Sequence, residues 1–154
     1  MKFNSRQDIG APIAEVFAAV SNFETFELQM LRRGIEVVRL DDGADPAKAA
    51  WRIAFDFRGR QRQMAARVVR YEPATGHTLS GHTDGLNVEI VTELIELSKS
   101  RTRLLVSCEL LPQSITARLL VQSLKLAKGN LARRFDARLE TFAREIERKH
   151  DRKA

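Results

Sequence analysis

The sequence predicts an α+β fold, with a seven-stranded antiparallel sheet and a long C-terminal helix. Three observations predict it. Apolar residues alternate with polar ones through the middle of the chain, the pattern of strands with one solvated face. Two short segments with helical spacing follow the first strand, and the last quarter carries one apolar stripe at steps of three or four residues. Helices kept apart from a run of strands are typical of the α+β class.

Length and composition predict one domain over residues 1–154. Hydrophobic residues make up 44% of the chain and charged residues 30%, a balance typical of folded proteins. Cys108 is the single cysteine, which excludes an internal disulfide framework and a cysteine-based zinc finger. The first residues contain no apolar segment of the kind that a secretory signal requires, and no apolar run approaches the roughly 20 residues of a membrane span. We therefore expect a cytoplasmic protein.

The N-terminal part predicts a strand followed by two short helices. Residues 3–9 form the strand, and Gly10-Ala11-Pro12 ends it. Proline suits the first position of a helix because its missing N–H is not needed there. Asn22 can cap the second helix. The helical spacing rests on Ile13, Val16, Phe17 and Val20 in the first helix and on Phe23, Phe26 and Met30 in the second.

Six further strands follow, separated by short turns rich in Gly, Pro, Asp and Ser. Two of them are the short segments 34–40 and 77–80. In the other four, apolar residues share one face: Trp51, Ile53, Phe55 and Phe57; Met64, Ala66 and Val68; Leu86, Val88, Ile90 and Leu94; Leu104, Val106, Cys108 and Leu110. With the first strand, these segments give the seven strands of the predicted sheet.

The last element is predicted to be one helix over about 114–148, capped by Ser114. Its first half is apolar on several sides, which predicts that it is surrounded by other parts of the protein. Gly129-Asn130 is the one interruption, and it either bends the helix beside the cavity or allows close packing against a bulky strand residue. The stripe consists of Leu120, Leu124, Ala127, Leu131, Phe135, Leu139, Phe142 and Ile146.

Two segments carry a family resemblance. They are the opening Ile9-Gly10-Ala11-Pro12-Ile13-Ala14-Glu15-Val16-Phe17-Ala18-Ala19-Val20-Ser21-Asn22-Phe23, and Arg101-Thr102-Arg103-Leu104 near the last strand. Both are similar to the START-like or Bet v 1-like (SRPBCC) superfamily of polyketide cyclase/dehydrase-like proteins. The resemblance implies the helix-grip fold, a curved sheet wrapped around the long helix with an apolar cavity between them. Members of the superfamily hold lipids, sterols, polyketides or plant hormones there, and some catalyse ring closure or dehydration.

From this resemblance we expect binding or transport of a hydrophobic small molecule or lipid, with no cofactor, no metal and no catalytic residue assigned. The sequence contains no phosphate-binding loop, dinucleotide fingerprint, hydrolase elbow or common zinc motif. Apolar pockets of about 300–1,000 Å³ are the usual ligand sites. The residues expected to line the cavity are Trp51, Phe55, Val88, Ile90, Val106, Leu120 and Leu124.

Two other functions are open. The protein is alternatively a cyclase or aromatase, with Asp56, His77, Thr92 or Glu109 moving protons in the same cavity, or a scaffold that uses the C-terminal helix for interactions. Ser80, His82 and Asp84 share a strand face at steps of two, which makes a relay conceivable. No motif supplies an oxyanion hole beside them, so they carry no catalytic assignment.

The positive charge is concentrated in the last quarter of the chain. Residues 1–112 are neutral, whereas residues 113–154 carry 11 basic and 5 acidic side chains and account for the net charge of +6. A solvated helix face is the plainest interpretation, and weak contact between the C-terminal helix and an anionic membrane is a second one. Sequence-specific nucleic-acid binding is not expected, because one Tyr and one Trp leave few stacking platforms.

Overall fold

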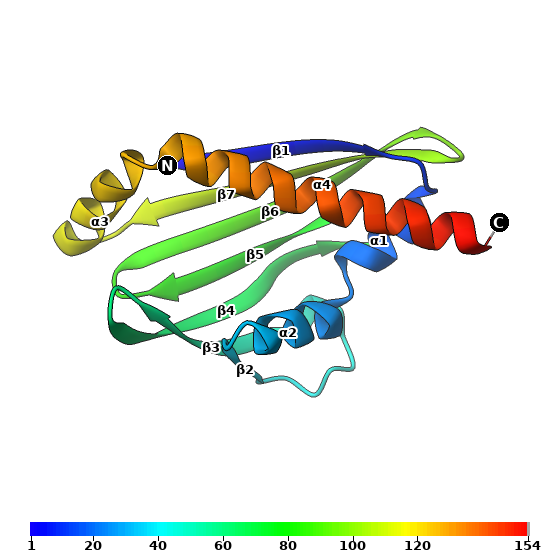
Figure 1. The fold of residues 1–154 in the computed structure, drawn as a ribbon. Helices are drawn as coiled ribbons and strands as arrows, with labels where there is room; N and C mark the ends of the chain where they lie inside the picture. The colour runs from blue at the N-terminus through cyan, green and yellow to red at the C-terminus, as the bar shows by residue number, and fades with distance from the viewer. Residues whose placement is uncertain (154) are drawn as a thin grey trace.

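The computed structural model describes residues 1–153 and contains seven antiparallel strands in one open, curved sheet. The strand order is β1-β7-β6-β5-β4-β3-β2, so every pair but β1–β7 joins consecutive strands. Helices cover one side of this sheet, and α4 crosses it obliquely (Figure 1). The strands are β1 (Lys2–Ile9), β2 (Glu36–Arg39), β3 (Ala50–Phe57), β4 (Arg60–Glu72), β5 (Gly76–Thr83), β6 (Leu86–Ser98) and β7 (Arg101–Pro112). The predicted fold class is confirmed.

The helices are α1 (Ile13–Val20), α2 (Phe23–Arg32), α3 (Ile115–Lys125) and α4 (Lys128–Lys153), with a short 3-10 turn, η1 (Pro46–Lys48), before β3. The two short helices after the first strand are therefore confirmed. Asn22 caps α2 as predicted, because its side-chain oxygen accepts a hydrogen bond from the backbone N–H of Thr25 at 3.2 Å.

The C-terminal helix differs from its prediction in one respect. It is long, but it begins at Lys128, and the segment before it forms the separate helix α3. Ser114 caps α3, since its hydroxyl oxygen accepts the N–H of Ala117 at 3.1 Å. The chain leaves α3 through a tight turn in which the N–H of Ala127 donates to the carbonyl of Leu124. The break thus precedes Gly129-Asn130, which lies in the first turn of α4.

This division also corrects the expectation that the first half is surrounded. Ile115, Leu119 and Leu126 are 77%, 62% and 94% exposed. Only one side of α3 packs on the sheet, with Ala117 and Val121 buried against Leu86. The turn lets α3 cover the end of the sheet where β6 begins and β7 ends, while α4 takes a different direction. Figure 1 shows α3 at the opposite end of the molecule from the C-terminus.

The tightly packed half of the molecule lies under α4. Its buried core combines the end of β1, helix α1 and the C-terminal half of α4, with Ile9, Val16, Leu104 and Ala143 fully excluded from solvent. Polar contacts fasten the same region. The carboxylate of Glu147 accepts the N–H of Gly10 at 2.6 Å, and Nδ1 of His150 lies 2.7 Å from the Glu15 carboxylate. These contacts hold α4 against the start of the chain.

The Thr-Arg pair near the last strand has a structural role. The buried hydroxyl of Thr102 donates to the carbonyl of Ala11 at 2.9 Å, which holds the break between β1 and α1. The guanidinium of Arg103 forms two bonds to Asp8 on the neighbouring strand β1, at 2.8 and 3.1 Å. This pairing lowers the pKa of Asp8 through the hydrogen bond from Arg103. Both residues therefore position the first helix against the sheet.

Candidate functional site

Two small residues lie in the middle of the helix-covered face of the sheet. Across four strand pairs the register aligns Trp51, Ala66, Gly81, Val88 and Leu110. Ala66 and Gly81 occupy the middle of this row, so little side-chain volume rises from the sheet there. Any Cβ at Gly81 would lie 2.8 Å from the sulfur of Met64, which shows that the Met64 side chain lies across this glycine. The Met64 side chain therefore fills the space above the middle of this row.

Next to Met64, a cavity of about 470 Å³ lies between α3 and the ends of the strands. Its size falls within the usual range of small-molecule sites, about 300–1,000 Å³. The apolar part of the wall comes from the sheet and from the inner side of α3. It consists of Phe55, Phe57, Met64, Leu86, Leu110, Ala117, Leu119, Leu120 and Leu124. Most of these side chains are half-buried, as expected for a wall that faces an open cavity.

Two arginines form a charged rim on this cavity. Arg58 and Arg62 both line it, and their guanidinium carbons lie 5.4 and 5.7 Å from the centre of the Phe57 ring. Arg62 pairs with Asp84 at 2.9 Å, and Arg58 donates to the hydroxyl of Ser123 at 2.7 Å. The second contact ties the β3–β4 turn to α3. An apolar wall with a cationic rim suits a molecule that has an apolar body and an anionic or polar end.

A second hollow, of about 520 Å³, lies between α2 and β3–β4. It shares Phe55 and Met64 with the first, so the two adjoin across these side chains. Its wall also includes Met30 and Gly34 at the end of α2 and Asp56 on β3. The helix-covered face of β3 and β4 is therefore open on both sides of Phe55.

The structure places the seven predicted cavity residues in several different environments. Phe55, Leu120 and Leu124 come together in the wall of the 470 Å³ cavity. Val106 is buried in the core beneath α4, and Ile90 packs against that core. Val88 packs beside Leu86 and Leu110, next to the cavity but outside its wall.

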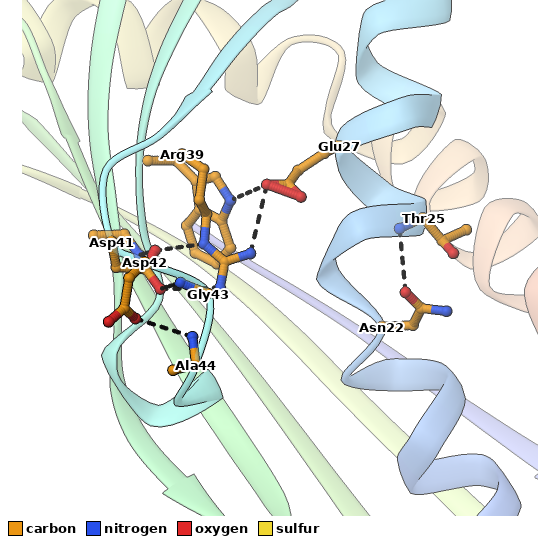
Figure 2. A network of polar contacts seen from close by, with 10 residues as sticks. Asn22, Thr25, Glu27, Arg39, Asp41, Asp42, Gly43 and Ala44 are labelled. Atoms are coloured by element: carbon orange, nitrogen blue, oxygen red, sulfur yellow. Dashed lines mark hydrogen bonds and ion pairs between the residues drawn. The ribbon is translucent and has the colours of Figure 1, made fainter.

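Trp51 lies elsewhere, beside a polar network between α2 and β2. Its indole N–H donates to the carboxylate of Glu27 at 3.1 Å, and the Arg39 guanidinium lies over its ring. Figure 2 shows Arg39 between Glu27 and Asp41. The hydrogen bond from Arg39 lowers the pKa of Asp41 far below its ordinary value, so this carboxylate stays ionised. Trp51 thus fastens α2 to the sheet and does not line the cavity.

Several wall residues were not predicted from the sequence. Met64, Leu86, Leu110, Ala117 and Leu119 line the cavity because α3 turns toward this end of the sheet. Alternation had placed Met64, Leu86 and Leu110 on the correct face of their strands. The arginines Arg58 and Arg62 were visible as a basic turn, and only the tertiary structure brings that turn beside α3.

The polar groups considered for catalysis do not converge. Glu109 lies between Cys108 and Leu110 on β7, so it points to the face without helices. Asp56 lines only the hollow beside α2. Nδ1 of His82 lies 2.6 Å from the side-chain oxygen of Asn87, whereas Asp84 pairs with Arg62. The Ser80–His82–Asp84 relay is therefore absent from the structure of residues 1–153. No cluster of three His, Cys, Asp or Glu side chains in this range has the arrangement of a metal site.

His77 and Thr92 lie opposite each other on β5 and β6, and both are buried. Nε2 of His77 donates a hydrogen bond to the carbonyl of Val20 at 2.9 Å, while Nδ1 has no partner among residues 1–153. The ring stacks on Tyr71 and meets the edge of Phe23. Burial lowers the pKa of His77 from its ordinary value of 6.5, and the nearby charge of Arg70 lowers it further.

This burial predicts acid sensitivity. The unfolded chain takes up a proton at His77 near pH 6.5, and the folded protein only at lower pH, so stability is lost as pH falls below about 6.5. We expect the free energy of unfolding, measured in urea between pH 7.5 and 5, to decline in the parent and to decline less in His77→Gln. His82→Gln, on a more exposed histidine, is the matched control. If the free energy of unfolding depends on pH equally in the parent and in His77→Gln, the prediction is wrong.

Comparisons with known proteins agree with this architecture. A family profile described as "Polyketide cyclase / dehydrase and lipid transport" matches residues 1–147. No curated protein sequence matches the chain. Among solved structures, the Zhui aromatase/cyclase from Streptomyces sp. R1128 is similar with a TM-score of 0.66 and 14% identity, covering 97% of this chain and 94% of that one.

Two further structures have the same fold. A conserved protein from Geobacillus kaustophilus has a TM-score of 0.55 and 16% identity, with 97% of each chain covered. A START superfamily protein from Mycobacterium smegmatis has a TM-score of 0.52 and 15% identity, covering 90% of this chain and 98% of that one. At these identities the likeness establishes the fold.

Proposed function

Because this chain belongs to the polyketide cyclase/dehydrase and lipid transport family, we propose that it binds a hydrophobic small molecule or lipid in the cavity between α3 and the sheet. The single observation that carries the proposal is the cavity itself, about 470 Å³ with a largely apolar wall. An open apolar wall of this size gains free energy when a ligand displaces water from it, at roughly 25 cal/mol per Å². The whole chain, residues 1–154, acts as one domain in this proposal.

The rim narrows the ligand class. Arg58 and Arg62 stand at the edge of the apolar wall, and Arg62 already shares its charge with Asp84. Arg58 is exposed, and within residues 1–153 its one side-chain hydrogen bond is to the neutral hydroxyl of Ser123. A guanidinium that lacks a carboxylate partner binds carboxylate or phosphate oxygens well. We therefore propose an amphiphile, with its apolar body against Phe55 and Leu120 and its anionic end at Arg58.

The test uses the fluorescent probe anilinonaphthalene sulfonate and its displacement by fatty acids. We expect the probe to bind the parent. A long-chain fatty acid should displace the probe at a lower concentration than its uncharged methyl ester does. Leu124→Phe narrows the cavity and should lower the affinity for the probe at least about tenfold. The free energy of unfolding should change little, because an open wall accepts extra side-chain volume better than a packed core does.

Leu97→Phe is the matched control, since Leu97 is exposed on β6 and lines neither hollow. A saturating ligand at 100 times its dissociation constant should add about 2.7 kcal/mol to the stability of the parent. The proposal fails if no apolar compound shifts the melting temperature and Leu124→Phe unfolds the protein, because the interior would then be solid.

Turnover in the same cavity is the second candidate. The family profile and the likeness to an aromatase/cyclase favour it, and Thr83, Asp84 and Thr116 supply polar groups within the cavity wall. A bound polyketide-like compound recovered with a changed mass would support turnover. Recovery of the compound unchanged, with tight binding, would support a carrier. Asp84→Asn then decides whether Asp84 takes part, because it should abolish turnover and leave binding intact.

A further inference from the structure

The outer side of α3 carries an apolar stripe that nothing in residues 1–153 covers. Ile115, Leu119 and Leu126 are spaced by four and seven residues, so they lie above one another on one side of the helix. All three are more than half exposed, and Leu126 is 94% exposed. The buried residues Ala117 and Val121 lie on the other side. Single exposed apolar residues are ordinary, whereas three in a row form a patch that marks an interaction surface.

Basic side chains lie along one edge of this stripe and at its end. Residues 113–135 contain five basic side chains and no acidic one. Arg118 and Lys125 are seven residues apart on α3 and flank the stripe along one edge, and Lys128 follows Leu126 at the start of α4. All three are exposed, and none forms an ion pair within residues 1–153. Their charges are therefore free for an external anion.

The β3–β4 turn adds to the same surface. The bond from Arg58 to Ser123 holds this turn against α3, and Arg60 at the turn is exposed. In Figure 1, α3 lies at one end of the molecule, beyond the tip of β7. A helix that presents apolar side chains beside lysine and arginine fits the boundary between the headgroups and acyl chains of a bilayer. Each basic residue near an anionic surface adds to the attraction.

We propose that α3 docks on the surface of an anionic lipid bilayer, with Ile115, Leu119 and Leu126 in the headgroup region and Arg118, Lys125 and Lys128 on lipid phosphates. Leu119 belongs to both the stripe and the cavity wall. Docking would therefore bring the bilayer beside the cavity. No helix in residues 1–153 could cross a membrane. Docking itself does not depend on the cavity holding a ligand, so the two proposals stand or fall separately.

The test is flotation of the full chain with vesicles of phosphatidylcholine containing about a third phosphatidylglycerol, against vesicles of phosphatidylcholine alone. We expect binding to the anionic vesicles at low salt and loss of most of it in half-molar salt, because exposed charges are screened. Ile115→Ser/Leu126→Ser should lower the partition coefficient at least about tenfold. Arg118→Gln/Lys125→Gln should lower it about tenfold.

Two control variants change residues that lie far from α3 along the strands and along α4. Ile95→Ser/Leu97→Ser removes two exposed apolar side chains near the β6–β7 turn, and Arg148→Gln/Lys149→Gln removes two charges near the end of α4. Both should bind vesicles like the parent. Equal losses in the charge control and in Arg118→Gln/Lys125→Gln would overturn the proposal, since net charge alone would then explain binding.

Other occupants of the stripe give different results. Absence of vesicle binding overturns the proposal and leaves an acidic protein partner. A dimer in solution that Ile115→Ser/Leu126→Ser dissociates overturns it too, because a second copy would then cover the stripe. Neither Ile115 nor Leu126 lines the cavity, so anilinonaphthalene sulfonate binding should survive in this variant. If the parent binds vesicles but not anilinonaphthalene sulfonate, the docking proposal holds and the ligand proposal fails.

Discussion

Gly76→Ala is expected to destabilise the protein by about 3 kcal/mol or more, a large part of the 5–15 kcal/mol that holds a typical domain folded. Gly76 begins β5 between β4 and β6, with a φ of +153°. A Cβ there would lie 2.0 Å from the carbonyl oxygen of Thr92. Because that oxygen belongs to the backbone of a central strand, the sheet itself would have to move.

Gly43→Ala separates the two causes of this loss. Gly43 has a φ of +80°, but a Cβ there would have no neighbour within 4 Å. Its substitution should cost only the strain of a left-handed conformation, about 1–2 kcal/mol. Urea unfolding of the two variants gives the comparison. Similar midpoints for Gly76→Ala and Gly43→Ala would contradict the close approach to Thr92.

The strands were predictable because their signal is local. Alternation at Trp51, Ile53 and Phe55 fixes which face of β3 meets the helices, whatever the rest of the chain does. The division between α3 and α4 was not predictable in the same way. The apolar steps continue through Leu124, Ala127 and Leu131, so the pattern shows no break. The turn is imposed by packing at two places, α3 on Leu86 and α4 on β1.

The site was predictable only in part, for a related reason. Phe55, Leu120 and Leu124 lie in the wall of the 470 Å³ cavity because each faces the space between sheet and helix. Which residues meet across neighbouring strands, such as Ala66 and Gly81, depends on the register between the strands, and neither strand determines that register alone. Trp51 was predicted to line the cavity from its strand face, and its hydrogen bond to Glu27, 24 residues away along the chain, is a tertiary contact that the strand pattern does not contain.

The last prediction compares the two halves of the interior. Leu104 has no exposed surface and packs among Ile9, Val16, Ala143 and Ile146. Leu104→Ala should therefore cost about 2–5 kcal/mol, because the removed methyl groups leave a void that rigid neighbours cannot fill. Leu124 is half-buried at the edge of the 470 Å³ cavity. Leu124→Ala removes the same atoms from a wall that already faces open space, so it should cost less than about 1 kcal/mol.

Both variants are measured by urea unfolding at pH 7.5, above the range in which His77 titrates. A large loss for Leu104→Ala with a small one for Leu124→Ala means that the interior is packed beneath α4 and open beneath α3. Equal losses would mean that α3 packs as tightly on the sheet as α4 does. The cavity would then be closed in solution, and the protein would need to open before any ligand could enter.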